Sequence, residues 1–292
     1  MEKNRKIKVG IIGTGNIGTD LLFKVQRSKY LECAIFTGRR PDSTGIARAK
    51  AMGINTSIDS VKAIEDNPDI CEVVFDSTSA KGHLENAPIL KKLGKFVIDL
   101  TPSRVGQMCV PALDLRSALK QDNINLVSCG GQACVPIAKA IMEVHPETKY
   151  IEVVGSIASK SAGMGTRSNI DEYIQTTRDA IEFYSGVPEA KAILILNPAE
   201  PEVWMHNTVY AVIENPNLEK LKQKISQVER QIQEYVPGYR VVLGPVYENG
   251  RLIVMSQVEG AGDFLPKYSG NLDIITSAAV RVAEEYAKNK VR

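Results

Sequence analysis

The sequence has almost no net charge and no long apolar run. Lysine and arginine number 36 against 34 aspartates and glutamates, a formal net charge of +2, which gives no reason to expect a nucleic-acid-binding surface. No apolar run approaches the ~20 residues of a membrane span. The basic N-terminus leads into a glycine-rich loop and not into the apolar stretch of a signal peptide. We therefore expect a protein that binds neither nucleic acid nor membrane.

Cysteine and histidine are also scarce. There are only three histidines, and the five cysteines form no Cys-x-x-Cys pair: Cys33, Cys71, Cys109, Cys129 and Cys134. An odd, scattered set is a poor disulfide framework and is typical of a reducing cytoplasm, where we place the protein. A zinc site needs clustered thiols and imidazoles, so we expect no metal.

The first half of the chain reads as a doubly wound α/β domain. At 292 residues the chain is long enough for two domains. Apolar runs separated by helix-like segments predict a parallel sheet covered on both faces. The strands are expected at 7–12, 31–36, 71–75, 96–100 and 123–127, with helices at 16–26 and 85–93.

After residue 129 the pattern changes to α+β. Longer strands are expected at 150–159, 192–196, 203–213, 239–247 and 252–258, with helices at 169–184, about 218–232 and 271–288. Asn249-Gly250 is a hairpin signal between the last two strands. Five apolar residues at helical spacing form one stripe that packs on its own domain or, alternatively, on a second copy: Leu218, Leu221, Ile225, Val228 and Ile232.

A G-x-G-x-x-G motif joins the first strand to the first helix. Gly13 permits a tight turn, Gly15 lets the backbone approach a pyrophosphate, and Gly18 lets the helix pack closely on the sheet. The N–H groups that open the helix favour phosphate. The alternative is a glycine-rich turn without a ligand, but the strand-turn-helix context favours dinucleotide binding.

The second strand ends without the acid that commonly holds the ribose hydroxyls of NAD. Arg39 and Arg40 stand there instead. An arginine at this place can pair with a 2′-phosphate, so one hypothesis is that NADP is accepted beside NAD. The other is that both arginines are solvated surface residues.

Cys129 differs from the other cysteines, which read as core residues. It follows the strand at 123–127 and precedes Gly130-Gly131 and a helix expected from about Val135. We expect the glycines to leave the sulfur open and the helix N-terminus to lower the thiol pKa from about 8.5 toward neutrality. The neighbouring N–H groups are candidates for binding an oxyanion.

Long motifs identify a family. They are Ile12-Gly-Thr-Gly-Asn-Ile-Gly-Thr-Asp-Leu21, Phe75-Asp-Ser-Thr-Ser-Ala80, Ile98-Asp-Leu-Thr-Pro102, Ser128-Cys-Gly-Gly-Gln-Ala133, the segment 156–172, Ile195-Leu-Asn-Pro-Ala-Glu-Pro201, Tyr235-Val-Pro-Gly-Tyr-Arg240 and Gly270-Asn-Leu-Asp-Ile-Ile-Thr-Ser-Ala278. Nearly end to end, the chain resembles the acylating acetaldehyde dehydrogenases of bacterial meta-cleavage pathways, which serve aromatic hydrocarbon catabolism.

The resemblance implies a Rossmann domain over 1–128, joined by the C-terminal helix 271–292. It also implies an α+β substrate and dimerisation domain over 129–270, as in semialdehyde dehydrogenases. The expected reaction converts acetaldehyde, or a short aldehyde such as propanal, with CoA and NAD(P)+ to acyl-CoA through a Cys129 thioester. A homodimer, and a complex with 4-hydroxy-2-oxovalerate aldolase, are further implications.

The family also implies which residues contact the cofactor. Beside the three glycines and Arg39 they are Thr14, Asn16, Ile17, Ser161, Ala162, Gly163, Met164, Gly165, Thr166, Arg167, Ser168, Asn169 and Asn271.

The chain departs from the family at one catalytic position. The family's Met-Arg-Asp-Thr-Val motif is here Met205-His-Asn-Thr-Val209. The neutral amide of Asn207 cannot act as a base, but it can orient water or substrate. Neighbours in a strand face opposite ways, so His206 is expected to point away if Asn207 faces the site. We therefore predict Asn207 as the positioning residue. His206, with an ordinary pKa of about 6.5, is the second candidate, as a base in place of the family's aspartate.

Two other functions stay open at this level. A phosphorylating semialdehyde dehydrogenase has similar architecture, and a dinucleotide-binding regulator without turnover would tolerate the change at Asn207. His83 and His145 are expected on helix or loop surfaces. Asp76 and Asp99, at strand ends, are equally compatible with caps or turns and with catalysis.

Overall fold

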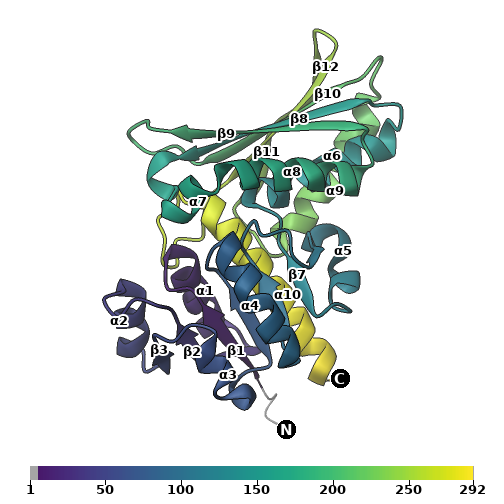
Figure 1. Cartoon of the computed structure of the whole chain (residues 1–292). Coiled ribbons are helices and arrows are strands. Elements are labelled where there is room, and N and C mark those ends of the chain that lie inside the picture. The colour runs from purple at the N-terminus through teal and green to yellow at the C-terminus, as the bar shows by residue number, and fades with distance from the viewer. Residues whose placement is uncertain (1–5, 292) are drawn as a thin grey trace. The chain divides into compact units, whose positions relative to one another are not determined.

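The chain forms two compact units (Figure 1). A computed structural model describes residues 6–291, with the side chains of Met164 and Val291 outside the described part. One unit holds Met1–Leu126 and Thr276–Arg292, and the other holds Val127–Ile275. Within the described residues no helix combines the length and apolarity that a membrane span requires.

The first unit contains a parallel sheet in the order β3-β2-β1-β4-β5-β7-β6. Its strands are β1 (Ile7–Ile12), β2 (Leu31–Thr37), β3 (Thr56–Ser57), β4 (Val73–Asp76), β5 (Phe96–Asp99), β6 (Gln107–Met108) and β7 (Asn123–Asn125). The chain runs outward from β1 in both directions, so the turns after β1 and β4 meet where ligands bind in such sheets. The predicted doubly wound fold is confirmed.

The helices of this unit connect its strands. They are α1 (Asn16–Arg27), α2 (Thr44–Ala51), α3 (Lys62–Glu65), a 3₁₀ turn (Pro68–Ile70), α4 (Ala80–Lys92), α5 (Pro111–Ala118) and most of α10 (Gly270–Val291). Helix α4 begins five residues before its predicted start, because the Ser79 hydroxyl caps it by accepting from the Gly82 N–H at 3.1 Å. The short helices α2 and α5 were not predicted, since eight residues give little periodicity.

The second unit contains a mixed sheet in the order β11-β12-β10-β8-β9. Its strands are β8 (Tyr150–Ala158), β9 (Glu189–Asn197), β10 (Met205–Val212), β11 (Tyr239–Glu248) and β12 (Arg251–Val258). Only β8 and β9 pair in parallel. The predicted hairpin is confirmed, because Asn249 and Gly250 adopt the positive φ values, 50° and 76°, that its tight turn needs.

Helices cover one face of this mixed sheet (Figure 1). They are α6 (Cys129–Val144), α8 (Ile170–Ser185) and α9 (Leu218–Gln233), while a 3₁₀ turn (Ser159–Ser161) and α7 (Met164–Ser168) precede α8. The apolar stripe of α9 packs within its own unit, against β11 and α6. Its residues are buried except Leu218, which is 39% exposed, so the first of the two interpretations is confirmed.

The helix after Cys129 begins earlier than predicted. We expected it from about Val135, but α6 starts at Cys129 and includes both following glycines. The Ser128 hydroxyl caps it by accepting from the Gly131 N–H at 2.9 Å, which offsets the low helix propensity of two glycines. Cys129 is therefore the first helical residue.

Candidate functional site

The glycine turn after β1 is built around Ser77. Gly13 has φ of 110°, and a Cβ there would lie 2.5 Å from Ser77 Oγ. A Cβ on Gly18 would lie 1.8 Å from the carbonyl oxygen of Gly13. By contrast, a Cβ on Gly15 would meet nothing within 4 Å. Gly13 and Gly18 are thus required by the fold, whereas only a ligand would need the open space at Gly15.

The end of β2 packs directly on this turn. A Cβ on Gly38 would lie 2.6 Å from Thr14 Cγ2, and the Ser43 hydroxyl donates to Thr14 Oγ1 at 2.8 Å. Arg39, next to Gly38, is exposed. Arg40 forms an ion pair with Asp42, with 3.1 Å between Nη2 and Oδ2. The guanidinium of Arg40 is therefore already engaged by a carboxylate of its own loop.

The remaining predicted residues of the turn begin helix α1. Asn16 is exposed and Ile17 is partly buried. The described first turn of α1 contains no acidic residue. No side-chain carboxylate of this turn therefore competes with an anion for its N–H groups.

Cys129 lies at the start of α6 in contact with Tyr173 of α8. The thiol donates to the Tyr173 hydroxyl at 3.6 Å, and the Gly130 N–H donates to the same oxygen at 3.1 Å. Thr177, one turn further along α8, bonds the Ser128 hydroxyl at 2.7 Å and donates to the Tyr173 carbonyl at 2.6 Å. Two helices thus fix the nucleophile candidate through hydroxyl groups.

The expectation of an open sulfur is wrong. Cys129 is only 9% exposed, and all five cysteines are buried without forming a disulfide among the described residues. The two glycines serve close packing, since a Cβ on Gly130 would lie 2.3 Å from the Tyr173 hydroxyl and one on Gly131 would lie 2.6 Å from Val127 Cγ1. Val127 itself has φ of 62°, a strained value for a β-branched residue, immediately before the cap.

The expected low thiol pKa is also wrong for this state of the protein. Burial raises the pKa of Cys129 to about 11, although the hydrogen bond with Tyr173 and the backbone of α6 act to lower it. In addition, the N–H groups of Gly130 and Gly131 already donate to Tyr173 and Ser128. They are therefore not open oxyanion donors in this arrangement.

Asn207 and His206 face opposite sides of β10, as predicted. Asn207 is fully buried on the helix-covered face, and neither of its amide atoms has a hydrogen-bond partner among the described residues. His206 is partly exposed and bonds the Trp204 carbonyl oxygen through Nδ1 at 2.9 Å. An unpaired buried amide costs folding free energy, so it is expected where a ligand or water completes it.

The predicted loop 161–169 is held by its own residues. Arg167 donates through Nη2 to the Ser159 carbonyl and through Nε to the Ala162 carbonyl, each at 2.9 Å. Asn169 donates to the Gly165 carbonyl at 2.6 Å, and Ser161 donates to the Ala158 carbonyl at 2.8 Å. The guanidinium of Arg167 therefore shapes the loop.

Exposure varies along the same loop. Ser161 and Ala162 are buried and Thr166 is partly buried. Gly163, Gly165 and Ser168 are exposed.

Asn271, in the first turn of α10, resembles Asn207. It is buried, and its Oδ1 has no hydrogen-bond partner among the described residues. The second unit thus contains two buried amides with unused hydrogen-bonding capacity, both at positions that the sequence assigned to the site.

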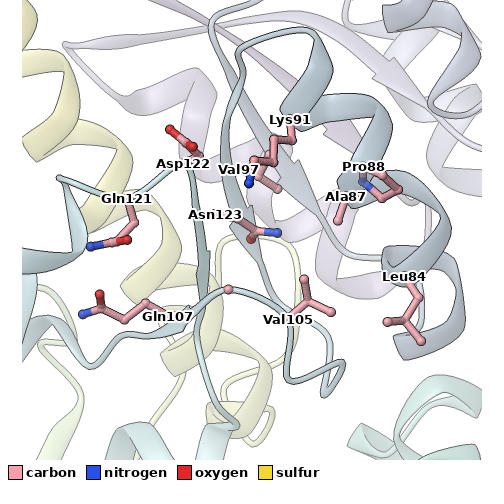
Figure 2. A pocket seen from close by; sticks show the side chains of 11 residues that line it. Leu84, Ala87, Pro88, Lys91, Val97, Val105, Gln107, Gln121, Asp122 and Asn123 are labelled. Atoms are coloured by element: carbon pink, nitrogen blue, oxygen red, sulfur yellow. The ribbon is translucent and has the colours of Figure 1, made fainter.

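A pocket of ≈ 390 Å³ in the first unit lies elsewhere (Figure 2). Leu84, Ala87, Pro88 and Lys91 of α4 form one wall, and Val105, Gln107, Gln121, Asp122 and Asn123 are among the other lining residues. Within the described chain none of the predicted site residues lines it. The pocket therefore does not identify the catalytic centre.

Sequence reasoning missed a buried histidine beside this pocket. His83, expected on a surface, is fully buried, with Nδ1 2.9 Å from Asp76 Oδ2 and Nε2 3.6 Å from Asp99 Oδ2. Burial alone would lower its pKa, but the bond to Asp76 and the charges of both aspartates raise it. Asn123 links the histidine to the pocket wall, with 3.0 Å between Nδ2 and His83 Nε2.

A sequence signal for this cluster did exist. Asp76 and Asp99 pair in register at the ends of adjacent strands, so their side chains need a cationic or hydrogen-bonding partner. His145 is likewise buried, and its Nδ1 lies 2.7 Å from Glu147 Oε1. Tyr173 had no such signal beyond its place just after the segment 156–172, one of the motifs that carry the family resemblance.

Comparisons with known proteins agree with this architecture. The family described as "Prokaryotic acetaldehyde dehydrogenase, dimerisation" matches residues 129–266, and "Semialdehyde dehydrogenase, NAD binding domain" matches residues 8–113. Aspartate semialdehyde dehydrogenase II from Vibrio cholerae matches with a TM-score of 0.61 at 13% identity, covering 97% of this chain and 98% of that one. The enzyme from Candida albicans matches with a TM-score of 0.66 at 11% identity, covering 97% and 100%. These two likenesses establish the fold alone.

Sequence relatives are much closer. The acetaldehyde dehydrogenase of Spirochaeta aurantia is 52% identical over 284 residues, 97% of this chain and 96% of the relative. That of Geobacillus stearothermophilus is 50% identical over 288 residues, 98% of each chain. One unit contains a glycine-rich dinucleotide turn, and the other contains a cysteine at the first position of a helix. Together with such identity along nearly the whole length, this shows that the chain belongs to the prokaryotic acetaldehyde dehydrogenase family.

Proposed function

We propose that the protein oxidises acetaldehyde with NAD+ and CoA to acetyl-CoA and NADH, and that Cys129 is the nucleophile. Family membership carries the reaction. The observation that carries the residue assignment is the thiol at the first position of α6, fixed by a hydroxyl that also bonds the helix N-terminus. None of the other four cysteines opens a helix in this way.

The residues of the glycine turn fit the pyrophosphate of NAD. The open space above Gly15 and the N–H groups of α1, free of an acidic neighbour, are what a phosphate requires. The loop 161–169 and Asn271, whose buried Oδ1 lacks a partner, would hold the nicotinamide end. When bound, NAD+ supplies the acceptor for the hydride that leaves the substrate.

Cys129 would form the covalent bond. The thiol loses its proton to water, and the thiolate attacks the aldehyde carbon, so that the carbonyl electron pair moves onto oxygen and a thiohemiacetal results. Loss of hydride restores the C=O bond and leaves a thioester on Cys129. The thiol of CoA then takes the acyl group and releases the cysteine, which divides one difficult step into two.

Asn207 would orient the reacting groups without exchanging a proton with them. Its amide is fully buried on the same face of the sheet that α6 covers, and neither Nδ2 nor Oδ1 has a hydrogen-bond partner among the described residues. A neutral amide can hold a water or a carbonyl oxygen but cannot act as a base. We expect Asn207→Ala to lower kcat, and an unchanged rate would remove this role.

NADP is a second acceptor that we propose on the strength of Arg39. Its neighbour Arg40 is already paired with Asp42, while Arg39 is exposed beside Gly38, which packs on Thr14 of the glycine turn. A guanidinium at this position can pair with a 2′-phosphate.

We propose that the open face of the mixed sheet joins two copies of the chain. In the second unit the helices lie on one face of the sheet (Figure 1). Along β8, β10 and β12, every second side chain points to the other face and is only partly buried. This open face is apolar at its centre, with Val154, Ile193, Tyr210, Ile253 and Met255, and Ile195 is 45% exposed. The same residues lie within the segment matched by the dimerisation family, which supports a second copy as the occupant.

A charge placed on this face tests the dimer. Met255→Glu should yield monomers by sedimentation velocity, because a two-fold contact would bury two new carboxylates, one from each copy, without a partner. Lys222→Glu, on the exposed side of α9, is the control that should leave the oligomer intact. A dimeric Met255→Glu variant would exclude this face.

The resemblance also favours a complex with 4-hydroxy-2-oxovalerate aldolase that passes the aldehyde directly. Co-expression of such an aldolase with this chain, followed by affinity purification at moderate salt, tests it. Absence of the aldolase from the purified dehydrogenase would oppose the proposal.

The reaction itself is tested by following NADH formation from acetaldehyde with and without CoA. The proposed function predicts turnover that depends on CoA and disappears in Cys129→Ala. Sustained turnover of Cys129→Ala would exclude the covalent mechanism.

A further inference from the structure

We propose that Tyr173 is a further catalytic residue. Its hydroxyl accepts a hydrogen bond from the N-terminus of helix α6 and donates one to the sulfur of Cys129, which stabilises the thiolate. The inference rests on the proposed role of Cys129 as nucleophile. It starts from an apparent conflict, because the reaction needs a thiolate while burial favours the protonated thiol.

The geometry around the hydroxyl resolves this conflict. The oxygen of Tyr173 lies 3.1 Å from the Gly130 nitrogen and 3.6 Å from Cys129 Sγ, and both of those groups donate to it. When the thiol loses its proton, the sulfur changes from donor to acceptor. The O–H of Tyr173 can then turn toward the sulfur while the Gly130 N–H continues to donate to the oxygen.

The resulting chain runs from the Gly130 N–H to the Tyr173 O–H and on to the thiolate. Each donor polarises the next, and hydrogen bonds to a charged acceptor are the strong ones. A helix N-terminus carries partial positive charge, which reaches the sulfur through the hydroxyl. A direct bond from Gly130 is not needed, since that N–H is already used by Tyr173.

Tyr173 is suited to remain a donor. Burial and the neighbouring Cys129 raise the pKa of Tyr173 well above its ordinary value, so the phenol keeps its proton at working pH. The hydroxyl therefore cannot serve as the base, and the thiol proton goes to water. A phenol beside a forming thiolate lowers the free energy of that charge without giving up its own proton.

The surroundings hold the hydroxyl in place. Thr177 ties α8 to the cap of α6 through its bond with Ser128. Gly130 is the residue that makes room, because any side chain there would overlap the Tyr173 oxygen. Both glycine and tyrosine are thus required for one contact.

The test compares Tyr173→Phe with Tyr150→Phe in the full-length protein. Tyr150 bonds Glu152 on β8 and serves as the control for losing a phenolic hydroxyl. For Tyr173→Phe we expect a roughly 10- to 100-fold fall in kcat/KM for acetaldehyde, as for a lost hydrogen bond to a charged group. Iodoacetamide should also alkylate Cys129 at least about tenfold more slowly at fixed pH, because alkylation follows the thiolate fraction.

Two further measurements separate the possible outcomes. NAD binding and the urea midpoint show whether Tyr173→Phe is folded, and Tyr150→Phe should match the wild type in rate and alkylation. Alkylation of Tyr173→Phe at the wild-type rate would overturn the inference, whatever its turnover. If Cys129→Ala retains turnover, the proposed function itself fails. If Cys129→Ala is inactive but Tyr173→Phe behaves as the wild type, the inference fails and the proposed function stands.

Discussion

Alanine at Gly130 is expected to destabilise the protein although it replaces glycine in a helix. Helix propensity alone would stabilise such a variant by about 1 kcal/mol. The added Cβ, however, would lie 2.3 Å from the Tyr173 oxygen, well inside any normal contact. Moving the ring costs about 1–3 kcal/mol as overpacking.

The displacement also breaks two hydrogen bonds. The Gly130 N–H and the Cys129 thiol both use the Tyr173 oxygen, and each neutral bond contributes about 0.5–1.5 kcal/mol. After the gain in propensity, the expected net loss in the free energy of unfolding is about 1–5 kcal/mol. Urea unfolding followed by circular dichroism measures it. Gly165→Ala is the control, since a Cβ there meets nothing within 4 Å, and its stability should be unchanged or higher.

A double variant makes the reasoning sharper. In Tyr173→Phe the oxygen is absent and the nearest ring atom is Cζ, 3.3 Å from the added Cβ, which small shifts can accommodate. Gly130→Ala should therefore cost at least about 1 kcal/mol less in that background. A Gly130→Ala variant as stable as the wild type, or equal costs in both backgrounds, would refute the packing argument.

Three further predictions concern the first unit. Gly15→Ala should keep the wild-type urea midpoint but weaken NAD binding in a fluorescence titration, because its Cβ meets no protein atom within 4 Å. Gly18→Ala should unfold at a lower urea concentration, because its Cβ would overlap the backbone of Gly13. A destabilised Gly15→Ala variant with normal NAD affinity would contradict this. Arg39→Ala should lower kcat/KM about tenfold or more for NADP while leaving that for NAD unchanged, and equal effects on the two cofactors would argue against a 2′-phosphate contact. His83 has a raised pKa in the folded protein, so the stability it contributes is fully present below its ordinary pKa of about 6.5 and is lost as pH rises through the raised value. His83→Gln should therefore flatten the decline in unfolding free energy as pH rises above about 6.5, and an identical pH profile would refute it.

Asp99 acts on stability in the same direction as His83. Burial raises its pKa to about 6, partly offset by the charge of His83. A carboxyl whose pKa is raised on folding stabilises the fold below its ordinary value of about 3.9 and loses that contribution as pH rises through about 6. His83 and Asp99 therefore both contribute more stability under mildly acidic conditions than at higher pH.

The features that sequence could predict are local ones. The glycine turn, the hairpin at Asn249-Gly250 and the opposite orientations of His206 and Asn207 follow from backbone geometry within a few residues. Apolar periodicity likewise defined the α9 stripe. Long motifs identified the family, although no physical argument from the residues alone reached acetaldehyde.

The features that sequence could not predict depend on distant partners. Tyr173 lies 44 residues from Cys129, and only the packing of α8 on α6 brings its hydroxyl to the thiol. That contact reverses the expected role of Gly130, from exposing the sulfur to making room for the Tyr173 hydroxyl. His83 was misplaced for the same reason, since its burial depends on carboxylates from β4 and β5.

The most direct test of the account is a single turnover without CoA. Mixing enzyme with acetaldehyde and excess NAD+ should give a burst of NADH equal to the number of Cys129 thiols, and mass spectrometry should find one acetyl group on the peptide that contains Cys129. Added CoA should remove this group as acetyl-CoA. A linear release of NADH without CoA, with Cys129 unmodified, would contradict the covalent mechanism and the central role of this residue.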